Sequence, residues 1–299
     1  MIAAARRLRP PLSVLVPVVT GLALVAGIAA SSSAGEAAEA PQPVRAFDEA
    51  QMVVYYGTPR TSGLGVLGRW DAAGAARQVQ ARAETFDRLN GDRGVVPAME
   101  VIYGMVTAEA GPRGDHVAYL SDDEIQPYLD AAEELDQQVI LDLQIGRNDP
   151  SSEIDRIDHL LKNPRVHVAI DPEYAVGPRG VPLQTLGRIT GDEVNEVQEA
   201  VRRIVEEHDL PPKMVVVHQF MDGTIVDGEA IERIGGVDLV LNMDAWGDVA
   251  AKKRMYEHFA AKPWAHNRSY NVFLRLDSAV SSEEELLRLA PTPDMFMYQ

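Results

Sequence analysis

The chain has 299 residues, of which 46% are apolar, and it carries a formal net charge of −17 and no cysteine. This acidic balance argues against nucleic acid and anionic lipid surfaces as partners, because both would be repelled electrostatically. Without cysteine there are no disulfides, and a chain of this size can bury enough apolar surface to fold without them. Glycans and other small polar molecules remain compatible with this composition.

The first 40 residues differ in composition from the rest of the chain. Arg6, Arg7 and Arg9 precede an apolar run over residues 12–30, and small residues follow it. This is the arrangement of a secretory signal peptide, although an apolar run of about 19 residues can also just span a bilayer. We therefore expect a secreted or otherwise extracytoplasmic protein. Residues 1–40 would be its leader or its anchor, and the one part that contacts a membrane.

A short linker at residues 41–50 precedes a region, 51–299, in which strand-like and helix-like segments alternate. The strands are expected at residues 52–56, 95–103, 139–145, 166–171, 214–219, 237–243, 271–276 and 295–298. Helices are expected at 71–89, 121–136, 151–161, 191–208, 227–234, 248–261 and 281–289. Two of them begin with predicted capping boxes, Ser121 with Glu124 and Ser281 with Glu284.

Eight short apolar strands separated by helices, over roughly 250 residues, predict a single (β/α)8 barrel of the TIM type, an α/β fold. A doubly wound open sheet is the alternative, but no Gly-x-Gly-x-x-Gly follows the first strand, as a dinucleotide site would require. The final helix of a complete barrel is missing from the chain. We expect the linker before the first strand to take its place.

Polar and aromatic side chains gather at the C-terminal ends of the predicted strands, where the active site of such a barrel forms. This convergence predicts a binding site for a small polar substrate. The candidates are Tyr55, Tyr56, Glu100, Tyr103, Asp142, Gln144, Asp171, Glu173, His218, Gln219, Asn242, Asp244, Trp246, Arg275 and Tyr298.

Two of these candidates form a pair at the end of the fourth strand. The sequence Val-His-Val-Ala-Ile-Asp-Pro-Glu-Tyr places Asp171 and Glu173 two residues apart, with Pro172 where the chain leaves the sheet. Residues two apart in a strand point to the same side. Two carboxyls held together at a buried strand end raise each other's pKa and are costly to desolvate, so the pair indicates a function.

Asp171-x-Glu173 at the end of a fourth barrel strand resembles the end of the active-site motif of family 18 glycoside hydrolases, and the Asp-x-Glu of family 25 lysozymes. The resemblance implies that Glu173 is the general acid and that Asp171 assists through the acetamido group of the substrate. The family 18 motif has another aspartate two residues before the pair, where this chain has Ala169. The region 166–174 with His218-Gln219-Phe220 also resembles a set of exported bacterial barrel proteins without an assigned activity.

On this interpretation the protein is a glycosidase-type hydrolase that acts on a cell-wall or other extracellular glycan. Glu173, Asp171 and Asp142 would be the catalytic carboxyls, because glycoside hydrolysis requires one protonated acid beside one ionised carboxylate. The remaining candidates would bind substrate, with aromatic rings for sugar faces and polar groups for hydroxyls. Neither a metal nor a cofactor is expected.

Several alternatives remain open at this stage. A metal-dependent hydrolase or isomerase could hold a divalent ion with Glu100, Asp142, Glu173, His218 and Asp244, although His-x-His and His-Glu-x-x-His are absent. A non-catalytic glycan-binding barrel is the other alternative, and Ala169 favours it. Single residues also have structural interpretations: an Asp142–Arg275 ion pair, a hydrogen bond from His218 to a loop, and packing for Tyr55, Tyr56 and Trp246.

Overall fold

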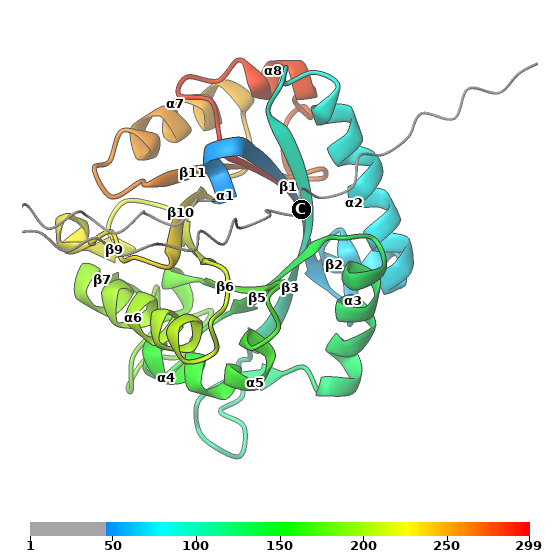
Figure 1. The fold of residues 1–299 in the computed structure, drawn as a ribbon. Helices are drawn as coiled ribbons and strands as arrows, with labels where there is room; N and C mark the ends of the chain where they lie inside the picture. The colour runs from blue at the N-terminus through cyan, green and yellow to red at the C-terminus, as the bar shows by residue number, and fades with distance from the viewer. Residues whose placement is uncertain (1–45) are drawn as a thin grey trace, which may run out of the picture. The chain divides into compact units, whose positions relative to one another are not determined.

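The computed structural model of the protein describes residues 46–299 (Figure 1). The expected leader at residues 1–40 and the first half of the expected linker lie outside the described residues. Within the described part of the chain, no helix has the length and apolar character needed to cross a membrane.

Eight parallel strands close into a barrel, which confirms the predicted α/β fold. They are β1 (Ala50–Thr58), β3 (Gly94–Val106), β5 (Gln138–Leu143), β6 (Val166–Ile170), β8 (Lys213–Gln219), β10 (Val237–Met243), β11 (Asn267–Val272) and β12 (Met295–Tyr298). Each strand pairs in parallel with the next, and β12 pairs with β1. The pairing of β1 with β3 completes the ring, so the open-sheet alternative is excluded.

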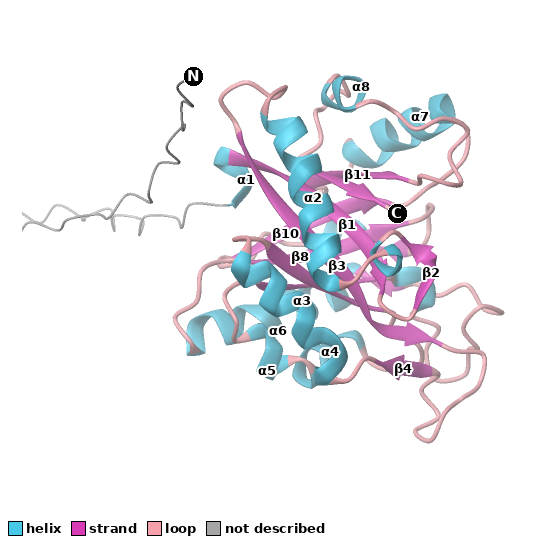
Figure 2. Ribbon diagram, turned by 90° about the vertical axis from the view of Figure 1, so that its right-hand side faces the viewer, coloured by secondary structure: helices cyan, strands magenta, loops and turns pink. Residues whose placement is uncertain are grey.

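Helices cover the outside of the barrel between successive strands (Figures 1 and 2). The longer ones are α2 (Ala72–Asp87), α3 (Asp122–Glu134), α6 (Gly191–Glu207) and α7 (Val249–Ala260). The shorter ones are α4 (Pro150–Arg156), α5 (Asp158–Leu161), α8 (Glu283–Leu287) and the 3-10 turn η3 (Gly228–Ala230), which replaces most of the helix expected at 227–234. Each packs an apolar face on the sheet, as the amphipathic pattern of the sequence predicts.

The helix caps follow local side-chain chemistry. Ser121 and Glu124 form the predicted capping box of α3. The last capping box is displaced by one residue from the prediction, because the Ser282 side chain accepts from the backbone N–H of Glu285. Ser281, the predicted cap, is instead buried. In the Ser-Ser-Glu-Glu-Glu run, either serine has a glutamate three residues later and could begin the helix. The structure uses Ser282 with Glu285, and in this arrangement Leu286 is buried in the core.

Four short strands and one helix were not expected from the sequence. Two of these strands, β7 (Ile189–Thr190) and β9 (Ile225–Val226), pair with each other in a separate two-stranded sheet. The hairpin strand β2 (Thr61–Gly65) pairs with the end of β1, and β4 (Val117–Tyr119) pairs with the end of β3. Figure 2 shows both at the same end of the barrel. The helix α1 (Ala46–Glu49) lies within the expected linker, and its Phe47 packs with apolar residues inside the barrel. The linker therefore helps to fill the barrel interior instead of replacing the missing outer helix.

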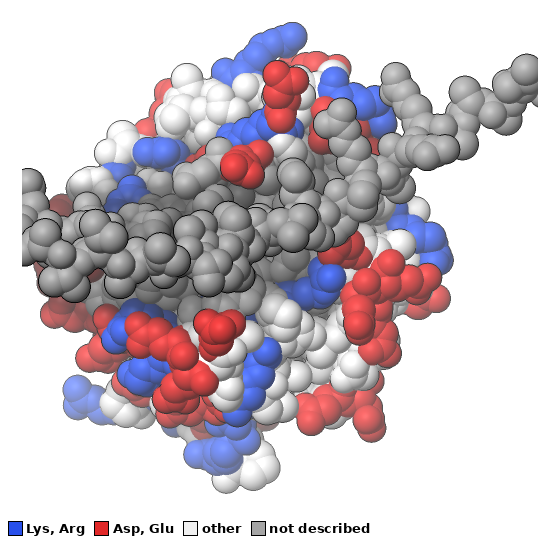
Figure 3. Space-filling model, viewed as in Figure 1, with Lys and Arg blue, Asp and Glu red and all other residues white. Residues whose placement is uncertain are grey.

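The apolar core has two parts, as the closed sheet requires. The larger part lies between the sheet and the helices and includes Val53, Phe86, Val168 and Phe296. The smaller part fills the barrel interior and includes Met52, Val54, Ile140, Val216 and Met297. On the face shown in Figure 3, acidic and basic side chains are interspersed around the uncovered part of the surface.

Candidate active site

A cavity of about 510 Å³ opens at the C-terminal end of the barrel. This volume is in the range of small-molecule sites. Its polar lining comes from the strand ends and the loops that follow them: Tyr56, Gln144, Asp171, Glu173, Asp244, Arg275 and Gln299. The aromatic lining comes from Phe220, Trp246 and Phe273, with Trp246 stacked on Phe220 at a ring-centroid distance of 5.3 Å. Tyr56, Gln144, Asp171, Glu173, Asp244, Trp246 and Arg275 are thus seven of the predicted residues at this cavity.

Beneath this cavity, a fully buried polar layer crosses the barrel interior. Strand alternation produces it, because every second residue of each strand points inward. On β1 the residues that point inward are Met52, Val54 and then Tyr56, which belongs to the polar layer. The other members of the layer come from the other strands and are Glu100, Asp142, His218, Asn242 and Asn271. Below this layer the barrel interior is mostly apolar, with His167, Asp238 and Ser269 as buried polar residues on the inward faces of their strands.

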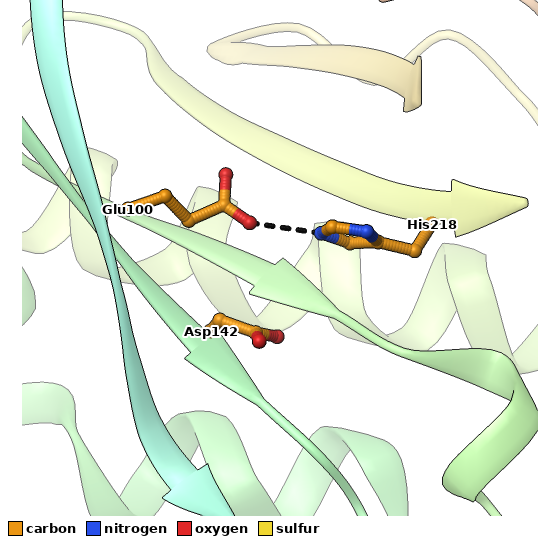
Figure 4. A group of neighbouring side chains, drawn as sticks. All are labelled: Glu100, Asp142 and His218. Atoms are coloured by element: carbon orange, nitrogen blue, oxygen red, sulfur yellow. Dashed lines mark hydrogen bonds and ion pairs between the residues drawn. The ribbon is translucent and has the colours of Figure 1, made fainter. Parts of the chain in front are cut away.

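His218 lies at the centre of this polar layer (Figure 4). Its Nε2 is 2.8 Å from a carboxylate oxygen of Glu100, and its Nδ1 is 3.3 Å from Asp244 Oδ2 and 3.5 Å from Asp171 Oδ1. Burial lowers the pKa of His218, but Asp171, Asp244 and Glu100 raise it, and the net pKa lies well above its usual value. His218 therefore carries a positive charge shared among three carboxyls, and the predicted loop hydrogen bond is not its role.

Burial raises the pKa values of the deepest carboxyls of the layer, Glu100 and Asp142. Asp142 Oδ2 accepts a hydrogen bond of 2.9 Å from the Tyr56 hydroxyl, and burial raises the pKa of Asp142 to about 8. Burial also raises the pKa of Glu100, although the hydrogen bond with His218 opposes this. Glu100 Oε2 and Asp142 Oδ1 are buried without a hydrogen-bond partner, which is costly unless they hold protons or bind a further group.

Asp171 connects the buried layer to the cavity. It follows β6 directly, is 2% exposed, and lines the cavity floor. Burial first, and then the nearby carboxylate of Asp142, raise the pKa of Asp171 well above its usual value, while His218 lowers it. Its Oδ1 lies within ion-pair distance of His218 but has no hydrogen bond, so it is available to a ligand.

Glu173 lies in the 3-10 turn η2 (Pro172–Tyr174), at the wall of the cavity. Pro172 has no N–H to continue the sheet, so the chain turns here and carries Glu173 away from the barrel axis. The side chain is half-buried, and its Oε2 is buried without a partner. Burial first, and then Asp171, raise the pKa of Glu173 well above its usual value. Burial and Asp171 thus favour the protonated form of the Glu173 carboxyl, and the residue lines the cavity.

Seven predicted substrate-binding residues lie away from the cavity or under its floor. Glu100 and His218 belong to the buried layer, as does Asp142, which was predicted to be catalytic. Tyr55, Tyr103 and Tyr298 are on the opposite face of their strands from the barrel interior and pack in the outer core, Tyr55 against Trp70 and Tyr298 near Phe86. Gln219 is buried and donates to Met221 O and Thr224 Oγ1. Asn242 is fully buried beside His218, with Nδ2 3.2 Å from Nδ1.

The proposed Asp142–Arg275 ion pair does not form. Asp142 is bonded to Tyr56 inside the barrel, whereas Arg275 lines the cavity mouth and donates to the backbone oxygen of Ser62. The strand expected at 271–276 instead covers Asn267–Val272, so Arg275 belongs to the following loop. A four-residue error in that strand accounts for the wrong pairing.

Sequence reasoning missed two residues that reach the site. Asn271 donates to Asp244 Oδ1 at 2.6 Å, and Gln299 donates to the same oxygen at 3.5 Å. Asn271 is the fifth residue of β11, and it was missed because the strand was expected to start there. Gln299 follows β12 at the C-terminal end of the barrel, and its position after the last strand was a usable signal.

Two groups of side chains in the described residues could hold a cation. Glu100, Asp142 and His218 offer ligand atoms within 4.8 Å of one another, and so do Asp171, His218 and Asp244. The two groups share His218, so one imidazole would have to serve both. Each group has two acids and one histidine. A metal site would be favoured by at least three acids and a histidine around one point, and neither group reaches that number.

Comparisons with known proteins give no family for this chain. No protein-family model matches the chain, and no curated protein sequence matches it. Among solved structures, a GH18 chitinase from Pseudoalteromonas aurantia matches with 9% sequence identity and a TM-score of 0.43, covering 82% of this chain and 92% of that chain. A hyperthermophilic endo-beta-1,4-glucanase in complex with substrate matches with 8% identity and a TM-score of 0.39, covering 73% and 81%. At this similarity the assignment of the barrel rests on its own strand order and register.

Proposed function

We propose that the protein is an exported glycoside hydrolase in which Glu173 is the general acid and Asp171 assists the substrate. The observation that carries this proposal is the position of Glu173. Its carboxyl, whose pKa is raised by burial and by Asp171, lies at the wall of an aromatic-lined cavity, with Asp171 on the adjoining floor. A general acid needs a raised pKa and access to the leaving-group oxygen, and Glu173 has both.

Family 18 enzymes have an aspartate at the position of Ala169. In this chain a carboxyl on the neighbouring strand β5 lies beside that position. Ala169 pairs with Asp142 in the register of β6 with β5, and both residues face the barrel interior. Asp142 also acts on the pKa of Asp171. We infer that Asp142 replaces the missing carboxyl, which weakens the argument that Ala169 makes the barrel non-catalytic.

In the proposed reaction, Glu173 donates its proton to the glycosidic oxygen as the bond to the anomeric carbon breaks. Asp171, on the floor, stabilises the positive charge that develops on the sugar, directly or through an acetamido group. Tyr56, Gln144 and Gln299 line the cavity and supply hydrogen-bonding groups for sugar hydroxyls. The stacked pair Trp246 and Phe220 offers an aromatic face suited to a sugar ring.

A metal-dependent hydrolase is the second candidate, because the two cation-capable groups around His218 favour it. Unpartnered oxygens on Glu100, Asp142 and Asp171 would be free to act as ligands. Carboxylates and one imidazole would suit Mg²⁺ or Mn²⁺ better than zinc. The hydrogen bond of His218 Nε2 with Glu100 counts against it, since that nitrogen would have to give up its proton to bind a metal.

The test is hydrolysis of a panel of cell-wall and storage glycans by the purified protein, with and without chelator, compared with Glu173→Gln. We expect activity that is indifferent to chelator and falls at least about a hundredfold in Glu173→Gln, because the acid is lost. Glu229→Gln, at an exposed glutamate on η3, is the matched control and should retain full activity.

Two outcomes would replace the proposal. Activity that chelator abolishes and Mn²⁺ or Mg²⁺ restores would establish the metal-dependent alternative. Glycan binding without turnover by the wild type would establish a binding barrel.

A further inference from the structure

Large apolar side chains gather at the mouth of the cavity, beside Arg275, whereas its floor is acidic. Exposed large apolar side chains are normal when scattered, but a contiguous group indicates a binding surface. Of the nine in residues 46–299, four lie elsewhere (Leu89, Met221, Met255 and Val280) and five line this one cavity (Leu64, Leu183, Leu186, Trp246 and Leu276). Their exposed fractions run from 45% to 66%.

Leu183 is held outward at a conformational cost. It is 66% exposed and adopts a positive φ of 68°, in the left-handed region that a leucine rarely occupies. A non-glycine residue in this region is strained, and such strain clusters at ligand sites. Leu183 thus has a strained backbone conformation and an apolar side chain in contact with water. A bound apolar group would cover that side chain.

The other rim leucines are also fixed by backbone contacts. Leu64 lies in β2, where Gly65 at φ 77° approaches β1 so closely that a Cβ would lie 2.3 Å from the Tyr56 carbonyl oxygen. Leu186 precedes Gly187, whose N–H donates to the carbonyl oxygen of Glu173 at 2.7 Å. The apolar rim is thus built on the same backbone that holds the proposed acid.

The hydrogen bond between Gly187 and Glu173 indicates which part of a substrate would contact the rim. A general acid protonates the oxygen of the leaving group, so the leaving group lies beside it. The loop with Leu183 and Leu186 is bonded to Glu173, and the carboxyls that would hold the sugar lie deeper, towards the barrel axis. Leucines give apolar contact without hydrogen bonds, which suits an alkyl or isoprenoid chain better than another sugar.

We propose that the substrate is an amphipathic glycoside, with its sugar on the acidic floor and an apolar aglycone across the rim of Leu64, Leu183, Leu186, Trp246 and Leu276. This inference rests on the proposed function, since it uses Glu173 to orient the substrate. The glycosidic C–O bond breaks, and the proton of Glu173 goes to the aglycone oxygen. Water then adds its hydroxyl to the sugar and returns a proton to Glu173, so the products are a free sugar and an apolar alcohol.

The experiment measures Kd by isothermal titration calorimetry for methyl, butyl, hexyl and octyl β-glucosides and β-N-acetylglucosaminides, kept below micelle-forming concentrations. The protein is purified from an export-competent host that expresses the full chain. We expect the octyl glycoside to bind at least about tenfold more tightly than the methyl glycoside, because each fully buried methylene contributes up to about fourfold. The double variant Leu183→Ser/Leu186→Ser should lose this preference and keep its affinity for the methyl glycoside.

The matched control is Leu89→Ser/Val280→Ser, which removes two exposed apolar side chains away from the cavity and should keep the preference. Binding that does not depend on chain length, including no binding by either end of the series, overturns the inference. So does a preference that survives in the rim variant, or rim-dependent binding to phosphatidylcholine vesicles in place of the glycosides.

Hydrolysis of the same glycosides by the wild type, measured beside these titrations, separates the two proposals. A chain-length preference without any hydrolysis by the wild type would leave the amphipathic site in place and refute the catalytic role of Glu173. Hydrolysis with equal kcat/KM for methyl and octyl glycosides would support the catalytic role of Glu173 and refute the amphipathic site.

Discussion

Asp142→Asn should make the protein more stable at neutral pH and weaken the dependence of its stability on pH. Asp142 is fully buried, accepts from the Tyr56 hydroxyl, and has a pKa of about 8 against 3.8 for an ordinary aspartate. Asparagine keeps an acceptor for Tyr56 and places an N–H donor where the protonated carboxyl has its O–H. It cannot ionise, in either the folded or the unfolded chain.

The size of the effect follows from the linkage between protonation and folding. A carboxyl with a raised folded pKa contributes stability that is complete below pH 3.8 and is lost as pH rises towards 8, because only the unfolded chain releases the proton in that window. The loss is about 1.4 kcal/mol per pH unit, or on the order of 4 kcal/mol by pH 7. Because Asp142 has no solvent exposure, we make no reduction for solvent screening.

The assay is urea unfolding of the wild type and Asp142→Asn at intervals between pH 4 and pH 8. We expect the difference in unfolding free energy between the two proteins to shift in favour of Asp142→Asn by roughly 3 kcal/mol between pH 5 and pH 7. Burial of Glu100, Asp171 and Glu173 raises their pKa values too, so the wild type loses further stability in the same direction. A difference between the two proteins that is constant with pH would refute the account of the buried layer.

Two further predictions concern the acid and the cavity wall. The alkaline limb of the pH profile of kcat/KM should lie well above pH 4.5, because burial and Asp171 raise the pKa of Glu173 and the acid loses its proton only there; a limb near pH 4.5 would contradict the role of Glu173. Lys252→Met should lower the unfolding free energy by about 3 to 5 kcal/mol, because buried Asp277 would lose the partner that it shares with Asn271 O. Adding Asp277→Asn, which removes the unpaired charge and keeps an acceptor oxygen for a backbone N–H of Gly247 or Phe273, should restore part of that loss in urea unfolding. A cost below about 1 kcal/mol for the single variant would refute the pairing.

The barrel was predictable because its signals are local. Most strands are short apolar runs that end at a glycine, proline or polar residue, and the longer helices have an amphipathic face or a cap such as Ser121 with Glu124. The exception is β11, which begins with polar residues and was predicted four residues too late. The hairpin β2 was not predictable, because Thr61–Gly65 is exposed and shows no alternation of apolar and polar residues. It forms because Gly57 and Gly65 let it approach the end of β1, a contact that exists only after the barrel has closed.

The face of each strand was harder to predict than the strand itself. A strand of a closed parallel barrel is buried on both sides, so it has no polar face to mark its register. Tyr55 and Tyr56 are neighbours in an apolar strand, yet Tyr56 faces the barrel interior and bonds to Asp142, whereas Tyr55 packs on Trp70 in the outer core. Acids such as Glu100 and Asp142 were easier to place, because the barrel interior offers them partners and the helix layer does not.

The arrangement around His218 explains how so many acids share one barrel end. A neutral imidazole has one N–H, and it would leave a lone pair facing a carboxylate on the other side. His218 has Glu100 at Nε2 and both Asp244 and Asp171 at Nδ1, so two N–H donors and a positive charge suit it better. Asn242 would then turn its Oδ1, now without a partner, towards Nδ1.

The positive charge on His218 acts differently on Asp171 and on Glu173, the two carboxyls at the cavity. Asp171 lies within 3.5 Å of His218, so the imidazolium offsets part of the cost of ionising it. Glu173 has no such contact, and an ionised Asp171 would hold the proton on Glu173 more firmly. Glycoside hydrolysis needs this division between one ionised and one protonated carboxyl. The buried histidine, which touches no part of the cavity, is therefore what would assign the two roles.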